Sequence, residues 1–381
     1  MKSALSIILS IFVISLWGQT TFPQTIDTIL TRIVASVTGP GMTVGVVKDG
    51  QVISHNSRGN MNLEYNLPFN DSTRFDLASV TKQFTAACIG ILVERKQLSI
   101  DDDVRRYIPE LAFHGDTIKI KHLLNHTSGI RNHNVLLDLK GFDFAHRGYT
   151  NEMIQALMFR QRGVNNPPGE KMLYSNTNYV LLALVIERVS GQSIQEFAER
   201  EIFIPLQMSS TFYRHELGEV IKNRAYPHYL IGDTYQQPKS LTLCVGAGEM
   251  MSTIPDLAKW SEVFTNPRHR FSYLGDFITQ LDTLNSGKQM KHARGMFISP
   301  YRGYKTFNHS GRGFGMRSQF ICIPTISLAI IVYTNSEQLN AVDVSYEILD
   351  LFLQESANGN SSTEPEDIPT PDLNSFEGIY Q

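Results

Sequence analysis

The sequence is poor in cysteine, and its three cysteines stand far apart. Cys88, Cys244 and Cys322 form no Cys-x-x-Cys pair, so the chain lacks the pattern of a thiolate zinc site or a disulfide framework. We expect each to be a small buried apolar residue. An excess of one charge is also absent, because 34 Lys and Arg stand against 37 Asp and Glu. With no basic run, neither nucleic acid nor a membrane surface is expected as a partner.

Several catalytic signatures are missing as well. The chain has no Gly-x-Ser-x-Gly elbow, no His-Glu-x-x-His, no phosphate loop ending in Gly-Lys-Ser/Thr and no Gly-x-Gly-x-x-Gly. His122 and His126 are four positions apart, but no third ligand has suitable spacing. We therefore expect no metal and no cofactor, and we expect His126 to bond the backbone of its own turn, residues 127–129.

The longest apolar run lies at the N-terminus. It extends from Ala4 to Trp17 behind Met1-Lys2 and is followed by Gly-Gln-Thr, a pattern typical of a secretory signal peptide. An uncleaved transmembrane anchor is the alternative, but the run is shorter than the roughly 20 residues that span a bilayer. We expect residues 1–19 to be a signal peptide and the protein to be secreted or periplasmic.

Residues 20–354 are expected to form one α/β domain. Two β-branched runs joined by Asp49-Gly50 predict a hairpin over 42–54. Patterns and stop signals predict helices over 79–96, 178–189, 193–203 and 255–264, and strands over 318–322 and 326–333. Strands at both ends with helices between them predict a sheet-containing part, about 20–80 and 245–354, and a helical part, about 81–244.

The composition changes after about residue 354. Residues 355–371 are rich in Ser, Asn, Glu and Pro and are expected to be a linker. Residues 372–381 contain one strand-like stretch, which either joins the main sheet or begins a truncated appendage.

The first chemically suggestive segment is Ser79-Val80-Thr81-Lys82. At the start of the predicted helix, the Ser79 hydroxyl would meet unsatisfied N–H groups and the positive end of the helix dipole. Lys82 would lie on the same face and could accept the hydroxyl proton, as an activated serine nucleophile requires. The alternative is an ordinary N-cap beside a solvated lysine, because such a tetrad is expected about once by chance in this chain.

Two later segments strengthen the catalytic interpretation of Ser79 and Lys82. Tyr174-Ser175-Asn176 lies in a turn-rich stretch before a helix, and His309-Ser310-Gly311 precedes a glycine-rich strand. Taken singly, each segment is better explained by structure alone: the first as a packed turn and the second as a strand end that carries a hydrogen-bonded histidine. Together with the tetrad they form an ordered triple.

This triple resembles the serine penicillin-recognising family of class C β-lactamases, D-alanyl-D-alanine carboxypeptidases, D-aminopeptidases and related esterases, whose motifs are Ser-x-x-Lys, Tyr-x-Asn and Lys/His-x-Gly. The resemblance covers about residues 42–335 and includes the segments 98–104, 123–130 and 246–253. It implies a β-lactamase/transpeptidase-like α/β fold, with a central antiparallel sheet flanked by helices and an inserted, mainly helical subdomain. The active site would lie between the two parts.

The family also implies a role for each matching residue. Ser79 would form an acyl-enzyme, and Lys82 and Tyr174 would share its proton. The backbone N–H groups of Ser79 and of the residue after the third motif would bind the oxyanion. The side chain of the motif histidine would line the pocket, and the amide of the second motif would bind the substrate or hold the lysine. The residues assigned to substrate binding are Asn176, His309, Ser310, Gly311 and Arg312.

Two departures from the family pattern bear on the substrate. His309 stands where β-lactamases usually have lysine, which argues against efficient antibiotic hydrolysis; if its imidazolium is the binding form, β-lactam affinity should improve below about pH 6.5. Glu249 stands where the family often has glycine, and would narrow or charge one wall of the pocket.

Three functions remain open. The first is a carboxypeptidase, D-aminopeptidase or amidase acting on peptides with D-residues, and the second is an esterase or weak β-lactamase. The third is a non-catalytic penicillin- or peptidoglycan-binding sensor. The expected partners are small peptides, amides, esters or β-lactams, with peptidoglycan as a further candidate.

Overall fold

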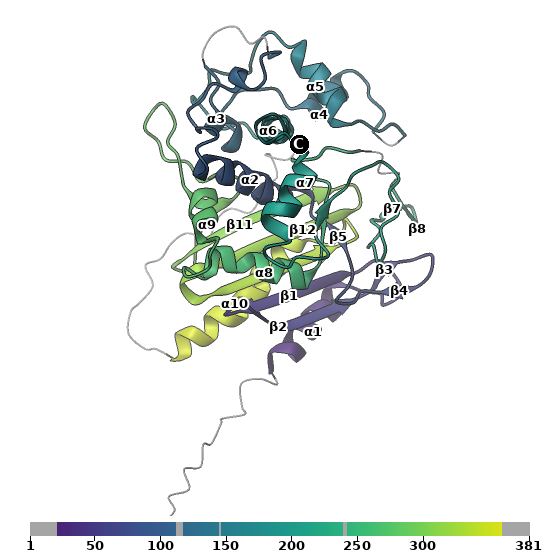
Figure 1. The fold of residues 1–381 in the computed structure, drawn as a ribbon. Helices are drawn as coiled ribbons and strands as arrows, with labels where there is room; N and C mark the ends of the chain where they lie inside the picture. Colours follow the sequence, from purple (N-terminus) through teal and green to yellow (C-terminus); the bar gives the residue numbers. More distant parts are fainter. Residues whose placement is uncertain (1–20, 112–116, 145, 239–241, 360–381) are drawn as a thin grey trace, which may run out of the picture.

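The computed structural model describes residues 21–111, 117–144, 146–238 and 242–359 (Figure 1). The predicted signal peptide, 1–19, and the C-terminal segment, 372–381, lie outside the described residues. The last helix, α10 (Ala341–Gly359), includes the first positions of the predicted linker at 355–371, and the rest of that linker also lies outside the described residues.

A six-stranded antiparallel sheet forms the centre, in the order β10-β11-β12-β13-β1-β2. The predicted first hairpin is present, and both residues of its turn, Asp49 and Gly50, have positive φ (50° and 75°), as a two-residue hairpin turn requires. β1 pairs with both β2 and β13, so the two ends of the domain meet in mid-sheet. The strands are β1 (Met42–Lys48), β2 (Gln51–Arg58), β10 (Phe297–Tyr301), β11 (Tyr304–Gly313), β12 (Met316–Ile323) and β13 (Leu328–Thr334).

Helices cover both faces of the sheet. On one face, α1 (Thr21–Ile33) and α10 pack on Val44, Val46, Ile330 and Val332. On the other face lies α8 (Ile254–Thr265), over the alternate residues of the same strands. Because both faces are covered, β13 is buried along its whole length, which explains its continuous apolar sequence.

The helical part lies beyond the second face, with α2 between it and the sheet (Figure 1). α2 begins at Lys82 rather than at Ser79, because residues 78–81 form a separate 3-10 turn, η1. The other helices are η2 (Val104–Arg106), α3 (Ile120–Leu124), α4 (His133–Leu139), α5 (Asn151–Phe159), α6 (Asn176–Ser190), α7 (Ile194–Ala198), the π-turn η3 (Glu199–Phe203), α9 (Ser272–Thr279) and η4 (Pro324–Ile326).

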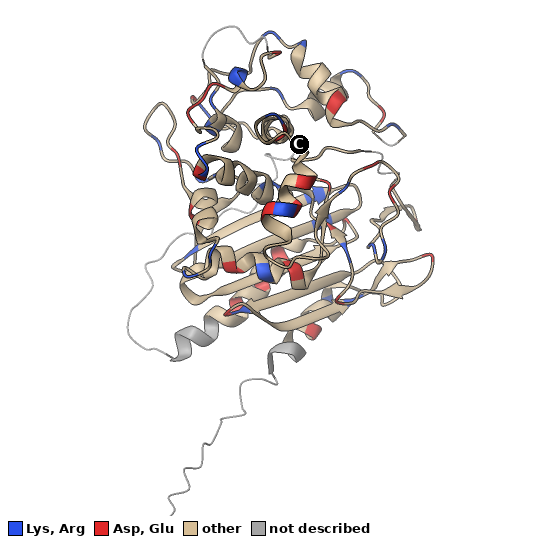
Figure 2. Ribbon diagram, in the orientation of Figure 1, with Lys and Arg blue, Asp and Glu red and all other residues tan. Residues whose placement is uncertain are grey.

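Short strands complete the structure, among them the pair that positions the predicted nucleophile. The strands are β3 (Asn60–Asn62), β4 (Leu67–Pro68), β5 (Phe75–Asp76), β6 (Phe212–Tyr213), β7 (Tyr229–Ile231), β8 (Thr234–Gln236) and β9 (Met250–Ser252). Acidic and basic residues are intermixed along the ribbon (Figure 2). Over the described ranges, no helix is both long and apolar enough to cross a membrane. The antiparallel sheet with flanking helices confirms the predicted fold class.

Trp260 connects α8, which covers the sheet, to α2 at the start of the helical part. Its ring on α8 stacks on Phe84 of α2 at 4.2 Å between centroids, and its Nε1–H donates to Gln83 Oε1 at 3.0 Å. The side chain is fully buried. This contact fixes α2, and with it the residues at its start, against the sheet layer.

We predict that Trp260→Ala lowers the free energy of unfolding by about 3–5 kcal/mol, because it removes a large buried ring and leaves a cavity. Denaturant unfolding followed by circular dichroism measures the change. Trp260→Phe retains most of the packing and should cost clearly less. Equal losses in the two variants would show that the ring stacking does not carry the stability.

Candidate active site

A tight bend places Ser79 at the entrance to α2. β5 pairs with β9, and the Leu77 N–H donates to the Met250 carbonyl at 2.9 Å. Ala78 then takes a left-handed conformation (φ 44°), with its N–H donating to the Asp76 carboxylate at 2.8 Å. A non-glycine residue in this conformation is strained, and the neighbouring hydrogen bonds hold it there. The bend directs Ser79 into a cavity, so this serine is not the α-helical N-cap considered above.

Lys82 is the most unusual side chain of the region. It is fully buried, and its Nζ donates to Ser79 Oγ (2.9 Å), Asn176 Oδ1 (2.9 Å) and the Ala247 carbonyl (2.8 Å). None of these three acceptors carries a negative charge, so burial lowers the pKa of Lys82 to about 7. A lysine that is partly neutral near pH 7 can accept a proton from the hydroxyl that it contacts.

The second motif meets the first at this amine. Asn176 is the first residue of α6, and its amide oxygen accepts from Lys82. Lys82 Nζ also lies over the ring of Tyr174, 5.0 Å from its centroid. The Tyr174 ring packs on His126 at 4.2 Å between centroids. The structure therefore brings together Ser79, Lys82, Tyr174 and Asn176, as the sequence predicts, while their chemical roles stay predictions.

The third motif reaches the site because β11 extends beyond the end of β10, the strand beside it. β10 pairs with β11 only as far as Asn308, so the next residues of β11 lie against η1 instead. Gly311 makes this approach possible, since a Cβ here would lie 2.3 Å from the Leu77 carbonyl oxygen. The Ser318 hydroxyl on β12 donates to the same carbonyl at 2.8 Å. Glycine is thus needed at this position for packing against the nucleophile turn.

The cavity in front of Ser79 has a volume of about 330 Å³. Its wall includes Ser79, Asn176 and Arg312 from the predicted set, together with Asp76, Glu249, Arg224, Glu337, Thr242, Cys244 and other residues. Ser310 and Gly311 belong to the strand behind Arg312 and are not part of this wall. Arg312, the next residue on β11, is itself exposed.

His309 is not among the residues that line this cavity, but its ring lies 6.3 Å from the Tyr174 ring between centroids. It is fully buried and its Nδ1 is 2.7 Å from the Ser310 carbonyl oxygen. Burial first, then the charges of Lys82 and His292, hold the pKa of His309 well below 6.5. These effects disfavour the imidazolium, so the structure gives no support to β-lactam binding that improves below pH 6.5.

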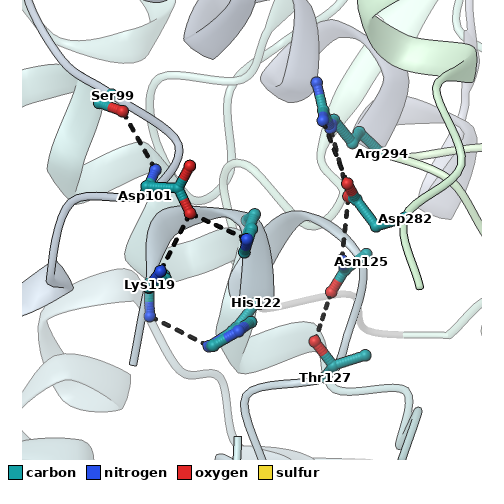
Figure 3. A network of polar contacts seen from close by, with 9 residues as sticks. Ser99, Asp101, Lys119, His122, Asn125, Thr127, Asp282 and Arg294 are labelled. Atoms are coloured by element: carbon teal, nitrogen blue, oxygen red, sulfur yellow. Dashed lines mark hydrogen bonds and ion pairs between the residues drawn. The ribbon is translucent and has the colours of Figure 1, made fainter. Parts of the chain in front are cut away.

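The turn after α3 supports the second motif. The Thr127 carbonyl accepts a hydrogen bond from the Gly169 N–H, and the His126 carbonyl accepts one from the Leu173 N–H. Figure 3 shows the side chains that hold this turn: Asn125 accepts a hydrogen bond from Thr127 Oγ1 (2.6 Å) and donates one to Asp282 (3.2 Å). Asp282 in turn forms an ion pair with buried Arg294 at 3.3 Å. This network fixes the turn from which the Tyr174 segment extends.

The two histidines considered as metal ligands instead accept hydrogen bonds from backbone N–H groups. His122 Nδ1 accepts from the Lys119 N–H at 3.1 Å (Figure 3). His126 Nδ1 accepts from the Ser175 N–H at 3.3 Å, so its backbone partner lies in the second motif and not in its own turn. Among the described residues, no group of three or more His, Cys, Asp or Glu could hold a metal ion.

Some site residues were not found by sequence reasoning. The Ala247 carbonyl is a backbone group, so no residue type signals it, although its segment was noted. Asp76 and Arg214 were not singled out, because Arg214 pairs with Glu249 and the charge of Asp76 acts on Glu249 across distant segments. Ordinary sequence patterns carry no signal for such a pairing.

The fold and the Ser-Lys-Tyr-Asn arrangement define the class: a β-lactamase/transpeptidase-like protein with its site between sheet and helical part. Residues 26–354 match the family described as Beta-lactamase, and the chain belongs to that family.

The chain is 30% identical to Penicillin-binding protein 4* of Bacillus subtilis, over 80% of this chain and 69% of that protein. It also resembles the octameric penicillin-binding protein homologue of Pyrococcus abyssi, with 26% identity, a TM-score of 0.74, and 87% and 77% of the two chains covered. The D-amino acid amidase of Ochrobactrum anthropi shares the fold, with 22% identity, a TM-score of 0.73, and 89% and 99% covered.

We predict that the acylation rate constant rises with pH through an ionisation near pH 7, because only neutral Lys82 can accept the Ser79 proton. Lys82→Arg should lower the acylation rate constant at least about 100-fold, because a guanidinium group stays protonated and cannot accept the proton. Single-turnover release of p-nitrophenol from p-nitrophenyl acetate, with enzyme in excess, measures the acylation rate constant of the wild type at each pH and that of Lys82→Arg.

A second group in the cavity titrates in the same range, so a control is needed. Burial and the charge of Asp76 raise the pKa of Glu249 to about 7. The inflection should persist in Glu249→Gln if it belongs to Lys82. Its disappearance in that variant, or a flat profile between pH 6 and 8 in the wild type, would contradict the assignment.

We also predict that Gly311→Ala lowers the acylation rate constant at least about tenfold, because the added methyl group would push η1 away from β11. Gly303→Ala is the matched control, since its surroundings are open, although its φ of 79° adds some local strain. Thermal unfolding of both variants separates a displaced nucleophile from loss of fold. Unchanged acylation in Gly311→Ala would show that the close approach is not required.

Proposed function

We propose that the protein is a serine hydrolase that forms an acyl-enzyme on Ser79 and cleaves amide bonds in substrates with D-amino-acid residues. The observation that supports this most is the Lys82 amine, buried without a negatively charged acceptor and 2.9 Å from the Ser79 hydroxyl. A binding protein gains nothing from a lysine held in this state, because burying it costs free energy. This argues against the non-catalytic sensor.

In the proposed acylation, Ser79 Oγ attacks the substrate carbonyl carbon while its proton passes to neutral Lys82. The backbone N–H groups of Ser79 and Arg312 stabilise the oxyanion of the tetrahedral intermediate. Lys82, with Tyr174 beside it, returns the proton to the leaving nitrogen as the C–N bond breaks. Asn176 holds Lys82 during these transfers.

Deacylation repeats the same steps with water. A water molecule attacks the ester carbonyl and passes a proton to the Lys82–Tyr174 pair. The C–O bond to Ser79 breaks, and the proton returns to the serine oxygen. The products are a carboxylic acid and free enzyme, so no cofactor is consumed.

The preference for D-amino-acid amides follows the relatives rather than the motif residues, because the motifs specify acyl transfer and the walls of the cavity specify the substrate. The similar proteins include a penicillin-binding protein and a D-amino acid amidase by name. An esterase activity is a second proposal, since the same acyl-enzyme forms more readily from an ester. Neutral, buried His309 provides no cation for a β-lactam carboxylate, which speaks against an efficient β-lactamase.

We also propose that the protein is exported through residues 1–19, with secretion or the periplasm as its destination and peptidoglycan peptides within reach. The basis is the apolar N-terminal run described above.

We predict that benzylpenicillin and p-nitrophenyl esters each add one acyl group to the wild type, and that the penicillin adduct is released slowly because its bulky remnant obstructs water. Intact mass spectrometry over time measures formation and loss of the adduct. Ser79→Ala should form none, while its thermal stability stays close to that of the wild type. Rapid penicillin turnover by the wild type, or adduct formation by Ser79→Ala, would contradict the proposal.

A further inference from the structure

A second cavity adjoins the catalytic residues on the side of Tyr174. Its volume is about 430 Å³. Ser79 lines the first cavity, whereas Tyr174 lines the second. Lys82 connects the two side chains, because its Nζ is 2.9 Å from Ser79 Oγ and 5.0 Å from the centroid of the Tyr174 ring. The second cavity therefore begins at a residue that takes part in the proposed proton transfer.

Helix α4 contributes to the walls of both cavities. Asn134 lines the first cavity, and the residues that follow it on α4 line the second. The helix lies beside α6 (Figure 1), and the His133 N–H donates to Thr177 Oγ1 at 2.8 Å, one residue after the second motif. These contacts fix α4 next to the site. The side chains of α4 that line the second cavity are Val135, Leu136 and Leu139.

The wall of the second cavity is apolar and open to solvent. Met172 and Leu173, from the segment that carries the second motif, join the apolar side chains of α4. Leu139 is 79% exposed, Val135 45% and Leu173 38%. Large apolar side chains that gather in this way around one cavity, rather than being scattered singly, are typical of a binding surface.

Two polar side chains in this wall are engaged within the protein. Arg131 Nη1 donates to the Gly163 carbonyl at 2.7 Å and to Gln161 Oε1 at 3.1 Å. Asn132 is the N-cap of α4 and accepts from the Asn134 N–H at 3.3 Å. None of the described residues in this wall is acidic. The surface that α4 offers to a ligand is therefore apolar.

The chemistry of acyl transfer decides which half of a substrate reaches this surface. When the scissile bond breaks, the acyl group stays on Ser79, which lines the first cavity. The leaving atom receives its proton from Lys82 and Tyr174, so it has to lie within hydrogen-bond reach of that pair. The group attached to the leaving atom then extends toward Tyr174 and the cavity that Tyr174 lines.

We propose that the second cavity binds the leaving group of the substrate, and that the protein prefers amides and esters whose leaving group carries an extended apolar chain. The chain packs on Val135, Leu139 and Leu173, where its methylene groups leave water. This proposal rests on the proposed acyl transfer at Ser79 and adds a substrate class to it.

Two esters with the same acyl group test the preference. Methyl acetate and hexyl acetate both leave an acetyl group on Ser79, and their alcohols have similar basicity, so they differ mainly in the apolar chain of the leaving group. The wild type should prefer hexyl acetate at least about tenfold in kcat/KM, through a lower KM, because the additional methylene groups are bound before and during the reaction. Titration of the released acid at constant pH measures the rates.

Methyl heptanoate shows on which side of the scissile bond the chain binds, since it is an isomer of hexyl acetate with the chain in the acyl group. Val135→Thr combined with Leu139→Gln makes the exposed part of the wall polar. This double variant should lower the preference for hexyl acetate over methyl acetate at least about threefold, and the preference for methyl heptanoate over methyl acetate less than about twofold. An equal loss of both preferences would overturn the proposal.

Val220→Thr combined with Leu217→Gln is the control variant. Both residues are exposed, at 90% and 40%, and neither lines the second cavity, so the same two substitutions should leave the preference for hexyl acetate intact. Light scattering of both double variants tests another occupant of the wall. If the α4 variant changed the molar mass and kept the ester preference, the wall would be a contact between copies of the chain, and the proposal would be overturned.

Binding without turnover separates this inference from the proposed reaction. Saturation-transfer NMR with Ser79→Ala compares N-hexylacetamide with N-methylacetamide. Binding of the hexyl compound that is lost on adding the α4 double change supports the leaving-group site, even if the wild type hydrolyses neither acetate, an outcome that would count against the proposed function alone. No binding of the hexyl compound, together with equal kcat/KM for the two acetates, would overturn the leaving-group site while Ser79-dependent ester hydrolysis stands.

Discussion

The burial of the Lys82 amine is the constraint on which the rest of the site depends. A fully buried amine without a negatively charged acceptor is stable only where neutral acceptors meet it at hydrogen-bond distance. Three separate segments supply them: η1 through Ser79, the start of α6 through Asn176, and the loop before β9 through Ala247. The same arrangement that makes the burial tolerable lowers the pKa of the lysine to about 7 and places it on the serine hydroxyl.

The fold is organised to bring those segments together. Because β1 pairs with β13, the two ends of the domain share one sheet. β5 pairs with β9 in a small sheet of β5, β9 and β6, and the chain bends into η1 directly after β5. The stacking of Trp260 on Phe84 fixes α2 against the sheet layer, while the turn held by Asn125 carries the loop of the second motif. Sheet and helical part therefore each contribute acceptors that neither could supply alone.

The sequence predicts local features well and contacts between distant segments poorly. The Asp49-Gly50 turn and the continuous apolar run of β13 have local physical causes, and both were predictable. The motif triple identified the nucleophile region only through resemblance to a family. The 3-10 turn before α2 was missed, because the strain at Ala78 depends on bonds to Asp76 and Met250, and the burial of His309 was missed because no local pattern reports it.

The charges around the cavity explain why its specificity need not follow that of β-lactamases. A lysine in the third motif would place a permanent cation beside the substrate, whereas burial holds the pKa of His309 well below 6.5 and His309 does not line the cavity. Lys82 is itself partly neutral near pH 7, so neither of these two residues holds a fixed positive charge at the reacting carbonyl. Glu249 adds a carboxyl group to the cavity wall where the family often has glycine, and burial with the charge of Asp76 raises its pKa to about 7. The wall also carries Arg224 and Arg312, so acidic and basic groups line the cavity together. The motif residues match the family, so a difference in substrate from β-lactamases has to come from the walls of the cavity.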